Sequence, residues 1–217
     1  MKRWSVLLPL MLLSCATPRS PEVRSYDFGM MDAGAKSAIQ LNAPLVILPV
    51  SAPSWLRGSA IVYRLRYADP PYPEAYGLSR WVAPPAELLT MRLLESTAAV
   101  NTGFTLASAD GNRTGYVIEV ALEEFIQEFE SPTLSRGVVQ VRASLVDRST
   151  GEIIAQQTLR AEELAPSADA PGAVRALTGA TNAVIARLMT WIGLTLGSVS
   201  STPSEYRSLA NEEQRVK

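Results

Sequence analysis

Three consecutive segments between residues 116 and 160 alternate apolar and polar side chains, and this pattern limits the possible folds more than any other feature. A period of two is typical of a strand that buries one face. The apolar residues fall at even positions from residue 116 to residue 122, but at odd positions at Phe125 and Phe129. Because a slip of one residue would turn the apolar set to the other face, we predict a β-bulge near Glu123 and Glu124.

The second and third segments, residues 137–147 and 153–160, flank a short polar loop that contains Gly151. A loop of this kind joins neighbouring antiparallel strands, so the three segments predict an antiparallel meander. Other short apolar runs predict strands over residues 45–50, 60–66 and 78–82. The proline-rich residues 69–73 predict an extended loop, and residues 110–112 predict a turn.

Helical periodicity appears twice, each time after a proline that suits the first turn of a helix. The first helix is predicted to open at Pro84-Pro85 and to run to residue 100, with Asn101 and Gly103 ending it. The second is predicted from Pro171 to about residue 196, with Asp169 as its N-cap. This order of elements predicts an α+β fold, an antiparallel or mixed sheet with two main helices packed on one face.

The composition removes several classes of function, because the 217 residues include no histidine and one cysteine. A Ser-His-Asp triad, a Cys-His dyad and a histidine metal site are therefore excluded. A single cysteine allows neither an intrachain disulfide nor a thiolate zinc site. The formal net charge of −1 gives no electrostatic basis for binding nucleic acid. We predict a protein that is not an enzyme and needs no cofactor.

Carboxylates are densest around Glu123 and Glu124. An acid–base pair needs two carboxylates in one cleft, whereas adjacent strand residues point to opposite faces unless a bulge intervenes. We therefore interpret this cluster as a solvated strand face. Asp147 and Glu152 bracket a hairpin loop, but they offer too few oxygen ligands for calcium. The sequence thus predicts no catalytic residue and no metal site.

The first fourteen residues form a targeting segment, with Lys2 and Arg3 followed by a short apolar run. That run is far too short to cross a bilayer core of about 30 Å, which indicates a signal peptide. Its end, Leu12-Leu13-Ser14-Cys15, resembles a bacterial lipobox. The resemblance implies cleavage before Cys15 and attachment of diacylglycerol and palmitate-type acyl chains there. The alternative is an ordinary signal peptide that has a cysteine at this position by chance.

The predicted organisation is a signal peptide (1–14), a lipidated cysteine and polar tether (15–25), one domain (26–197) and a flexible tail (198–217). In lipoproteins of this kind, Ala16 after the cysteine carries no inner-membrane retention signal. The resemblance therefore implies a periplasm-facing lipoprotein of the outer membrane of a Gram-negative bacterium. Several acyl chains would hold it firmly, because each buried methylene contributes about 0.8 kcal/mol.

Aromatic residues and prolines crowd into residues 53–85. Tyrosine and tryptophan suit protein interfaces because they combine a large apolar face with one polar group. We predict that Tyr72 and Tyr76 lie at the surface and bind a partner, and that Trp55 and Trp81 anchor the core. The alternative is that most of these side chains only pack the core or pin the loop.

Several segments in this order resemble the PqiC-like family of ABC-type transport auxiliary lipoproteins. They are residues 52–56, 61–64, 76–81, 84–89, 122–125, 150–151 and 169–177. The resemblance covers roughly residues 26–191. It implies an α+β domain that serves a lipid transporter, in which an inner-membrane ABC permease and ATPase act with a periplasmic MCE-domain assembly. No catalytic residues are carried over from this family.

The leading hypothesis is a non-catalytic lipoprotein that docks the MCE assembly at the outer membrane. Whether the protein is a monomer or a homo-oligomer stays open. A periplasmic lipoprotein that itself binds lipid or another apolar ligand is the alternative. A hydrolase that uses Glu123 and Glu124 is a third possibility. The transported substrate and the direction of transport stay open.

Overall fold

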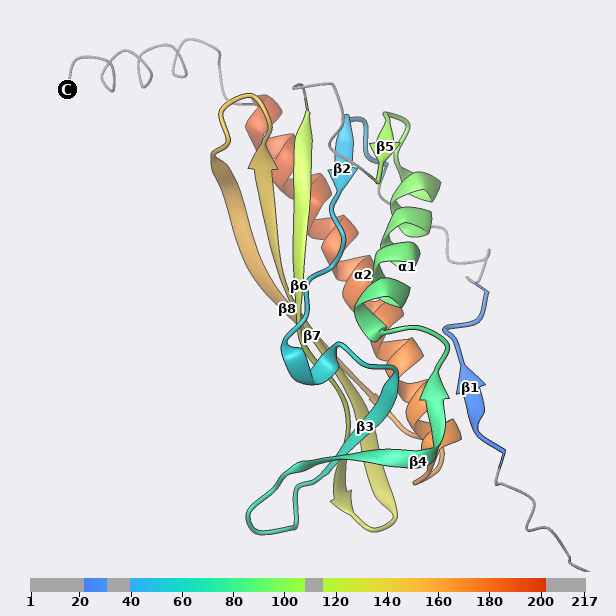
Figure 1. The fold of residues 1–217 in the computed structure, drawn as a ribbon. Helices are drawn as coiled ribbons and strands as arrows, with labels where there is room; N and C mark the ends of the chain where they lie inside the picture. The colour runs from blue at the N-terminus through green and yellow to red at the C-terminus, as the bar shows by residue number, and fades with distance from the viewer. Residues whose placement is uncertain (1–21, 31–39, 108–114, 202–217) are drawn as a thin grey trace, which may run out of the picture.

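The computed structural model describes residues 22–30, 40–107 and 115–201, with side chains described up to residue 198. In these ranges the chain forms eight strands, two α-helices and one short 3₁₀-helix (Figure 1). The strands are β1 (Arg24–Tyr26), β2 (Leu45–Ile47), β3 (Ala60–Leu65), β4 (Pro73–Trp81), β5 (Thr105–Leu106), β6 (Tyr116–Ser131), β7 (Leu134–Asp147) and β8 (Ile153–Leu164). The helices are η1 (Ser54–Leu56), α1 (Pro85–Val100) and α2 (Ala170–Ser201).

The predicted meander is confirmed, because β6, β7 and β8 pair antiparallel in sequence order. The predicted bulge is confirmed as well, since the register of β6 against β7 shifts between Leu122 and Glu124. Apolar residues on both sides of the shift then face the same core: Leu122 and Phe125 are each almost fully buried there. Because of the bulge, the apolar residues on both sides of it lie on the same face of β6.

Two further strands pair with the other edge of β6, one after the other along its length. β2 pairs parallel with the first half of β6, with Leu45 opposite Tyr116. β3 pairs parallel with the second half, with Tyr63 opposite Gln127. β4 then pairs antiparallel with β3, β1 parallel with β4, and β5 parallel with β2. The predicted mixed sheet is therefore confirmed.

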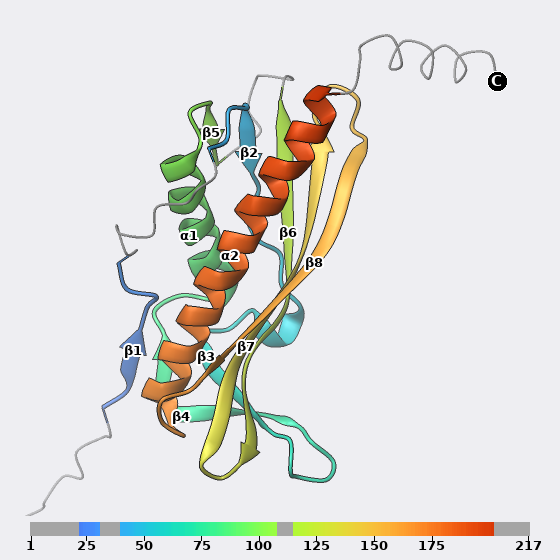
Figure 2. The ribbon, with the colours of Figure 1, turned by 180° about the vertical axis from the view of Figure 1, so that it is seen from behind.

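Both α-helices cover one face of this sheet, which we call the inner face (Figure 2). The apolar stripe of α2, which includes Leu177 and Leu188, packs against β7 and β8, and α1 packs beside it. Close approach requires Gly137 on β7, since a Cβ there would lie 2.6 Å from the backbone of Ala176. Among the described residues, no α-helix covers the opposite, outer face. The fold class predicted from sequence is confirmed.

The helix ends follow the predicted capping residues. Asp169 Oδ1 accepts a hydrogen bond of 2.8 Å from the backbone N–H of Gly172, as an N-cap does. Asn101 follows the last residue of α1 in extended conformation. α2 continues to Ser201, beyond the expected end near residue 196. The division of the chain into signal peptide, tether, domain and tail remains a prediction.

Two sequence expectations need correction, and two more fall outside the described residues. β4 begins at Pro73, so Tyr76 lies in a paired strand and not in the proline-rich loop. Trp81 is buried as predicted, but Trp55 is 41% exposed on η1 and does not anchor the core. The predicted turn at residues 110–112 lies outside the described residues, as does Cys15.

Candidate docking surface

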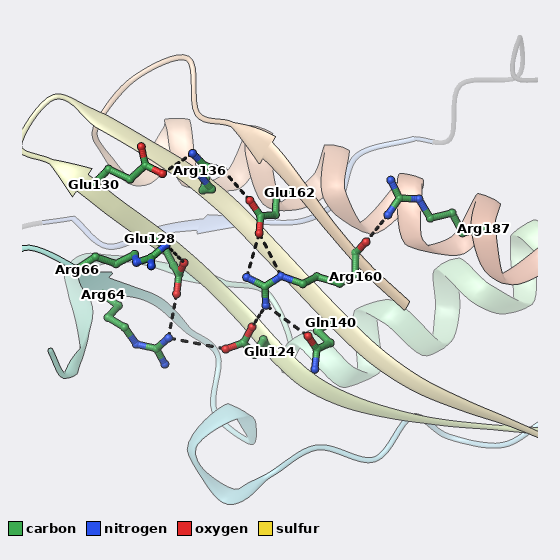
Figure 3. Close-up of polar contacts among 10 residues, drawn as sticks. All are labelled: Arg64, Arg66, Glu124, Glu128, Glu130, Arg136, Gln140, Arg160, Glu162 and Arg187. Atoms are coloured by element: carbon green, nitrogen blue, oxygen red, sulfur yellow. Dashed lines mark hydrogen bonds and ion pairs between the residues drawn. The ribbon is translucent and has the colours of Figure 1, made fainter. Parts of the chain in front are cut away.

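The outer face carries a small apolar cluster of Val62, Ile126 and Val138, which lie in one row across β3, β6 and β7. Charged residues on both sides of this row form an ion-pair network that surrounds it (Figure 3). The network consists of Arg64, Arg66, Glu124, Glu128, Glu130, Arg136, Arg160 and Glu162. Long charged side chains here cover apolar surface while their charged groups stay at the edge of the cluster.

Two residues join the charged rows on either side of the cluster. Arg64 lies 3.0 Å from Glu128 and 3.8 Å from Glu124, so it links the rows on the β3 side. Glu162 accepts hydrogen bonds from Arg136 at 2.7 Å and from Arg160 at 3.1 Å, so it links them on the β8 side. The network ties four strands together across the uncovered face.

Within the network, the pKa values of Arg136, Arg160 and Glu162 are shifted in the direction that favours the charged form. The hydrogen bond from Arg136 lowers the pKa of the Glu162 carboxyl, against the opposing effect of partial burial, and Arg160 lowers it further. Burial alone would lower the pKa of Arg160, but hydrogen bonds to Glu162 and Glu124 raise it. A carboxylate held ionised in this way is a poor general acid near neutral pH.

The bulge brings Glu123 and Glu124 onto the same outer face, where each is ion-paired. Glu123 lies 3.2 Å from Arg142 and accepts a 2.9 Å hydrogen bond from Gln140. Glu124 is paired with Arg160. Both carboxylates are thus engaged with cations, which fits a structural face better than an acid–base pair.

The hairpin loop after β7 uses Asp147 for its own structure. Its Oδ1 accepts hydrogen bonds from the backbone N–H of Ser149 at 2.7 Å and from the hydroxyl of Ser149 at 2.5 Å. Within the described ranges, no group of three or more Asp, Glu, Cys or His side chains is arranged to hold a metal ion.

Two adjoining grooves lie on the outer face, beside the segment that leads into η1. One, of about 460 Å³, lies between Pro49 and the strand residues Arg142 and Gln156. The other, of about 370 Å³, is walled by Pro53 and Trp55. The exposed Trp55 ring therefore lines a groove instead of the core, a position that the sequence pattern did not indicate.

The loop between β3 and β4 and the turn between β6 and β7 project together beyond the N-terminal end of α2 (Figures 1 and 2). We call this region the hairpin end. Its exposed large side chains are Tyr67, Tyr72 and Leu134. Tyr72 is 56% exposed, which confirms the predicted surface position, and Tyr67 is 51% exposed. The crowding of aromatic residues in the sequence did not distinguish Tyr67 as a surface residue.

Tyr72 is held by its neighbours at the hairpin end. Its hydroxyl is hydrogen-bonded to the Glu74 carboxylate, which raises the pKa of Tyr72. Tyr63 also donates to Glu74, and this bond is the largest cause of the raised pKa of Tyr63. The hydroxyl of Tyr72 is therefore engaged within the hairpin end, while its ring stays exposed.

Tyr76 does not share that surface, so its predicted exposure is wrong. Its ring lies 4.9 Å from that of Tyr63, and its hydroxyl donates a 2.7 Å hydrogen bond to the fully buried Gln127. Burial raises the pKa of Tyr76 to about 12, with a smaller contribution from the charge of Asp169. Tyr76 is a structural residue of the sheet.

The chain is also similar to solved structures and to one protein family. The crystal structure of protein XCC0632 from Xanthomonas campestris has a TM-score of 0.65 and 18% identity, covering 84% of this chain and 98% of that one. A crystal structure of an uncharacterised protein has a TM-score of 0.60 and 15% identity, covering 79% and 99%. These likenesses show the fold. No curated protein matches the chain in sequence.

The described ranges contain no helix with both the length and the apolar character needed to span a bilayer. The family model for the ABC-type transport auxiliary lipoprotein component matches residues 26–188, from the end of β1 into the second half of α2. This match covers most of the chain and confirms the family suggested by the sequence motifs. The chain belongs to the family of ABC-type transport auxiliary lipoproteins.

Proposed function

We propose that this protein is a non-catalytic auxiliary lipoprotein, anchored through Cys15 at the outer membrane, that docks the periplasmic MCE assembly of an ABC-type lipid or organic-solute transporter. The observation that carries the proposal is the family match over residues 26–188, which includes nearly the whole described fold. The transport partner is an MCE-domain protein with its permease and ATPase. The ion-paired state of Glu123 and Glu124 supports a non-catalytic role.

The start of the described fold is suited to bear an anchor. β1 pairs with β4, and Phe28, two residues after β1, is buried in the core. Arg92 of α1 donates hydrogen bonds to the carbonyls of Phe28 and Gly29, at 2.9 and 2.5 Å. A pull from a lipid on Cys15 would therefore be borne by the sheet and by α1 together.

Tethering explains how such a protein acts without chemistry. The ten residues between Cys15 and Tyr26 reach at most about 40 Å when fully extended, so the domain stays near the membrane surface. Confinement to this layer raises the effective concentration of the domain for a partner that arrives there. Docking at the hairpin end through Tyr67 and Tyr72 would then complete the bridge.

The anchor is tested by replacing the cysteine. Cys15→Ala should move the protein from the outer-membrane fraction to the soluble periplasmic fraction, and an unchanged outer-membrane fractionation would contradict the anchor. Ser14→Ala, which keeps a small residue before the cysteine, serves as the matched control and should leave fractionation unchanged.

Docking is tested by affinity capture of the full-length protein from native membranes in mild detergent. We expect MCE-domain and permease subunits among the captured proteins, and we expect Tyr67→Ala with Tyr72→Ala to reduce their yield at least fivefold. Phe104→Ala removes a ring that is even more exposed, at 76%, and lies far from the hairpin end, so it should not reduce the yield. Capture of neither subunit by the wild-type protein would overturn the proposal.

The alternative of a ligand-binding lipoprotein receives no support from the inner face. The apolar stripes that suggested a lipid cavity are used to fill the core between the sheet and the two helices. The grooves at Pro49 and at Trp55 lie on the outer face and have mixed polar and apolar walls.

A further inference from the structure

The end of β4 presents a row of three exposed side chains on the side away from the core. Trp81 is buried, and exposure alternates along residues 78–82, as expected for a strand with one buried face. Leu78, Arg80 and Val82 therefore point the same way, outward. Leu78 is 51% exposed and Val82 is 58% exposed. The row places a cation between two aliphatic side chains.

Strand β1 adds a third aliphatic side chain beside this row (Figures 1 and 2). Its parallel register with β4 sets Arg24 opposite Ser79, so the preceding residue, Val23, lies beside Leu78. Val23 is 41% exposed. Single exposed aliphatic residues are common on protein surfaces, whereas adjoining ones mark a surface that meets a partner. We define the β1–β4 patch as Val23, Leu78, Arg80 and Val82.

Arg80 differs from the arginines of the ion-pair network, all of which are paired with carboxylates. Among the described residues Arg80 has no ion-pair partner, and its Nε lies 3.5 Å from the hydroxyl of Ser25, at the limit of a hydrogen bond. The carboxylate of Asp27, at the end of β1, accepts a 2.8 Å hydrogen bond from the N–H of Gly29. A guanidinium that is left free in this way is suited to bind a phosphate group.

The lipid anchor proposed at Cys15 lies close to this patch along the chain. Seven residue steps separate Cys15 from Glu22, where the described structure begins, and they span at most about 25 Å when fully extended. Val23 is the next residue. An anchored chain therefore keeps the start of β1, and the patch beside it, within this distance of the bilayer surface.

We propose that the β1–β4 patch is the surface through which the anchored domain contacts the phospholipid bilayer, an inference that depends on the proposed anchor at Cys15. The aliphatic side chains enter the interfacial layer, and the Arg80 guanidinium stays level with the lipid phosphates. A bilayer fits this patch because it offers acyl chains and phosphate groups side by side. The contact sets the orientation of the domain, which the acyl chains alone do not.

The anchor explains why a small patch is sufficient. Three aliphatic side chains would bind a bilayer only weakly from solution, since even one myristoyl chain gives marginal binding. The lipid on Cys15 holds the patch at a high effective concentration at the surface, so that a weak contact is occupied. The direction in which the hairpin end is presented to the transport partner is then fixed as well.

The first test measures contact with lipid in the lipidated protein, reconstituted in phospholipid vesicles. Because Cys15 carries the lipid, Leu78→Cys supplies the only free thiol, to which a fluorophore is attached. Brominated phospholipids should quench this fluorophore at least threefold more strongly than one at Arg24→Cys, which is nearer the anchor along the chain but on the other side of β1. Equal quenching at both positions overturns the proposal, because nearness to the anchor would explain both.

The second test changes the chemistry of the patch. Arg80→Glu and Val82→Glu should each reduce the quenching at residue 78 at least threefold, whereas Met91→Glu, at an exposed apolar position of α1, should leave it unchanged. Circular dichroism establishes that each variant is folded. Quenching that persists in both patch variants overturns the proposal. A fluorophore that is shielded from water but not quenched by lipid would assign the patch to a second copy and also contradicts it.

Flotation of the same vesicles separates this inference from the proposed anchor. Protein that floats with the vesicles but is not quenched at residue 78 keeps its anchor and lacks only the bilayer contact. Protein that does not float contradicts the anchor at Cys15 and, with it, the contact. Neither result bears on docking at the hairpin end.

Discussion

The hydroxyl of Tyr76 on β4 donates a 2.7 Å hydrogen bond to Oε1 of Gln127 on β6, two strands away. Gln127 is fully buried, and its Nε2 donates a further hydrogen bond of 2.8 Å to the hydroxyl of Ser135. A buried amide needs such partners, because an unsatisfied buried polar group costs about 1–3 kcal/mol. The chain of three side chains joins β4, β6 and β7 beneath the hairpin end.

Replacing Tyr76 by phenylalanine should lower the free energy of unfolding by about 1–3 kcal/mol, because Oε1 of Gln127 loses its donor. Urea unfolding measures this loss. Tyr72→Phe, at an exposed position, should change stability by less than about 0.5 kcal/mol. If Tyr76→Phe unfolded at the same urea concentration as the wild type, the hydrogen bond between Tyr76 and Gln127 would contribute nothing to stability.

The raised pKa of Tyr76 also makes a prediction at high pH. Its value of about 12 lies above the ordinary value near 10, so the native state favours the neutral phenol. That contribution is complete below pH about 10 and is lost as the pH rises toward 12. The stability difference between the wild type and Tyr76→Phe should therefore shrink between pH 9 and pH 12. A difference that stayed constant over this range would contradict the burial of this phenol.

Glu162 should make the stability of the protein depend on pH at the acidic end, since the pKa of Glu162 is lowered in the folded protein. Its contribution is present above the unfolded value near 4.3 and is lost as the pH falls through the folded value. Glu162→Gln should cost up to about 1 kcal/mol at pH 7, as expected for a partly exposed network. The cost should decline as the pH falls below about 4. Glu95→Gln, at an exposed position of α1, is the control and should change stability by less than about 0.5 kcal/mol at pH 7.

The contact between Gly137 and α2 should not tolerate a methyl group. A Cβ there would lie 2.6 Å from backbone atoms of Ala176 and Leu177, and packed backbone cannot move aside without cost. We expect Gly137→Ala to destabilise the protein by about 1–3 kcal/mol in thermal or urea unfolding. Gly77→Ala, in β4 with open space around the added Cβ, should cost far less. Equal losses would mean that backbone freedom and not packing decides both sites.

Local pattern was enough to predict the meander and its bulge, because both depend on which face each residue of β6 presents. The switch from even to odd positions before Phe125 appears in the structure as the shift between Leu122 and Glu124. Helix ends were equally local: Asp169 and Asn101 occupy the predicted positions. These features need only a few neighbouring residues to be specified.

The remaining features depend on contacts between distant segments. The parallel pairing of β2 and β3 along β6 cannot be derived from periodicity, which shows that a strand exists but not its neighbour. Tyr76 was misplaced because the prolines before it suggested a longer loop, whereas Pro73 only opens the strand. Trp55 was misplaced because its size suggested burial, although tryptophan also suits the wall of an exposed groove.

The side chain of Asp169 caps the N-terminal end of the long helix α2. Asp169 accepts hydrogen bonds from the Gly172 N–H at 2.8 Å and from the Ser167 hydroxyl at 2.6 Å, and these lower the pKa of Asp169. Asp169→Ala should cost about 1 kcal/mol in urea unfolding, because the N–H loses its acceptor. Asp169→Asn keeps an acceptor oxygen and should cost much less at pH 7. Because the lowered pKa stabilises the native state only above the unfolded value near 3.9, the cost of Asp169→Ala should decline as the pH falls below about 4. If asparagine proved as damaging as alanine, charge and not hydrogen bonding would be the basis of the cap.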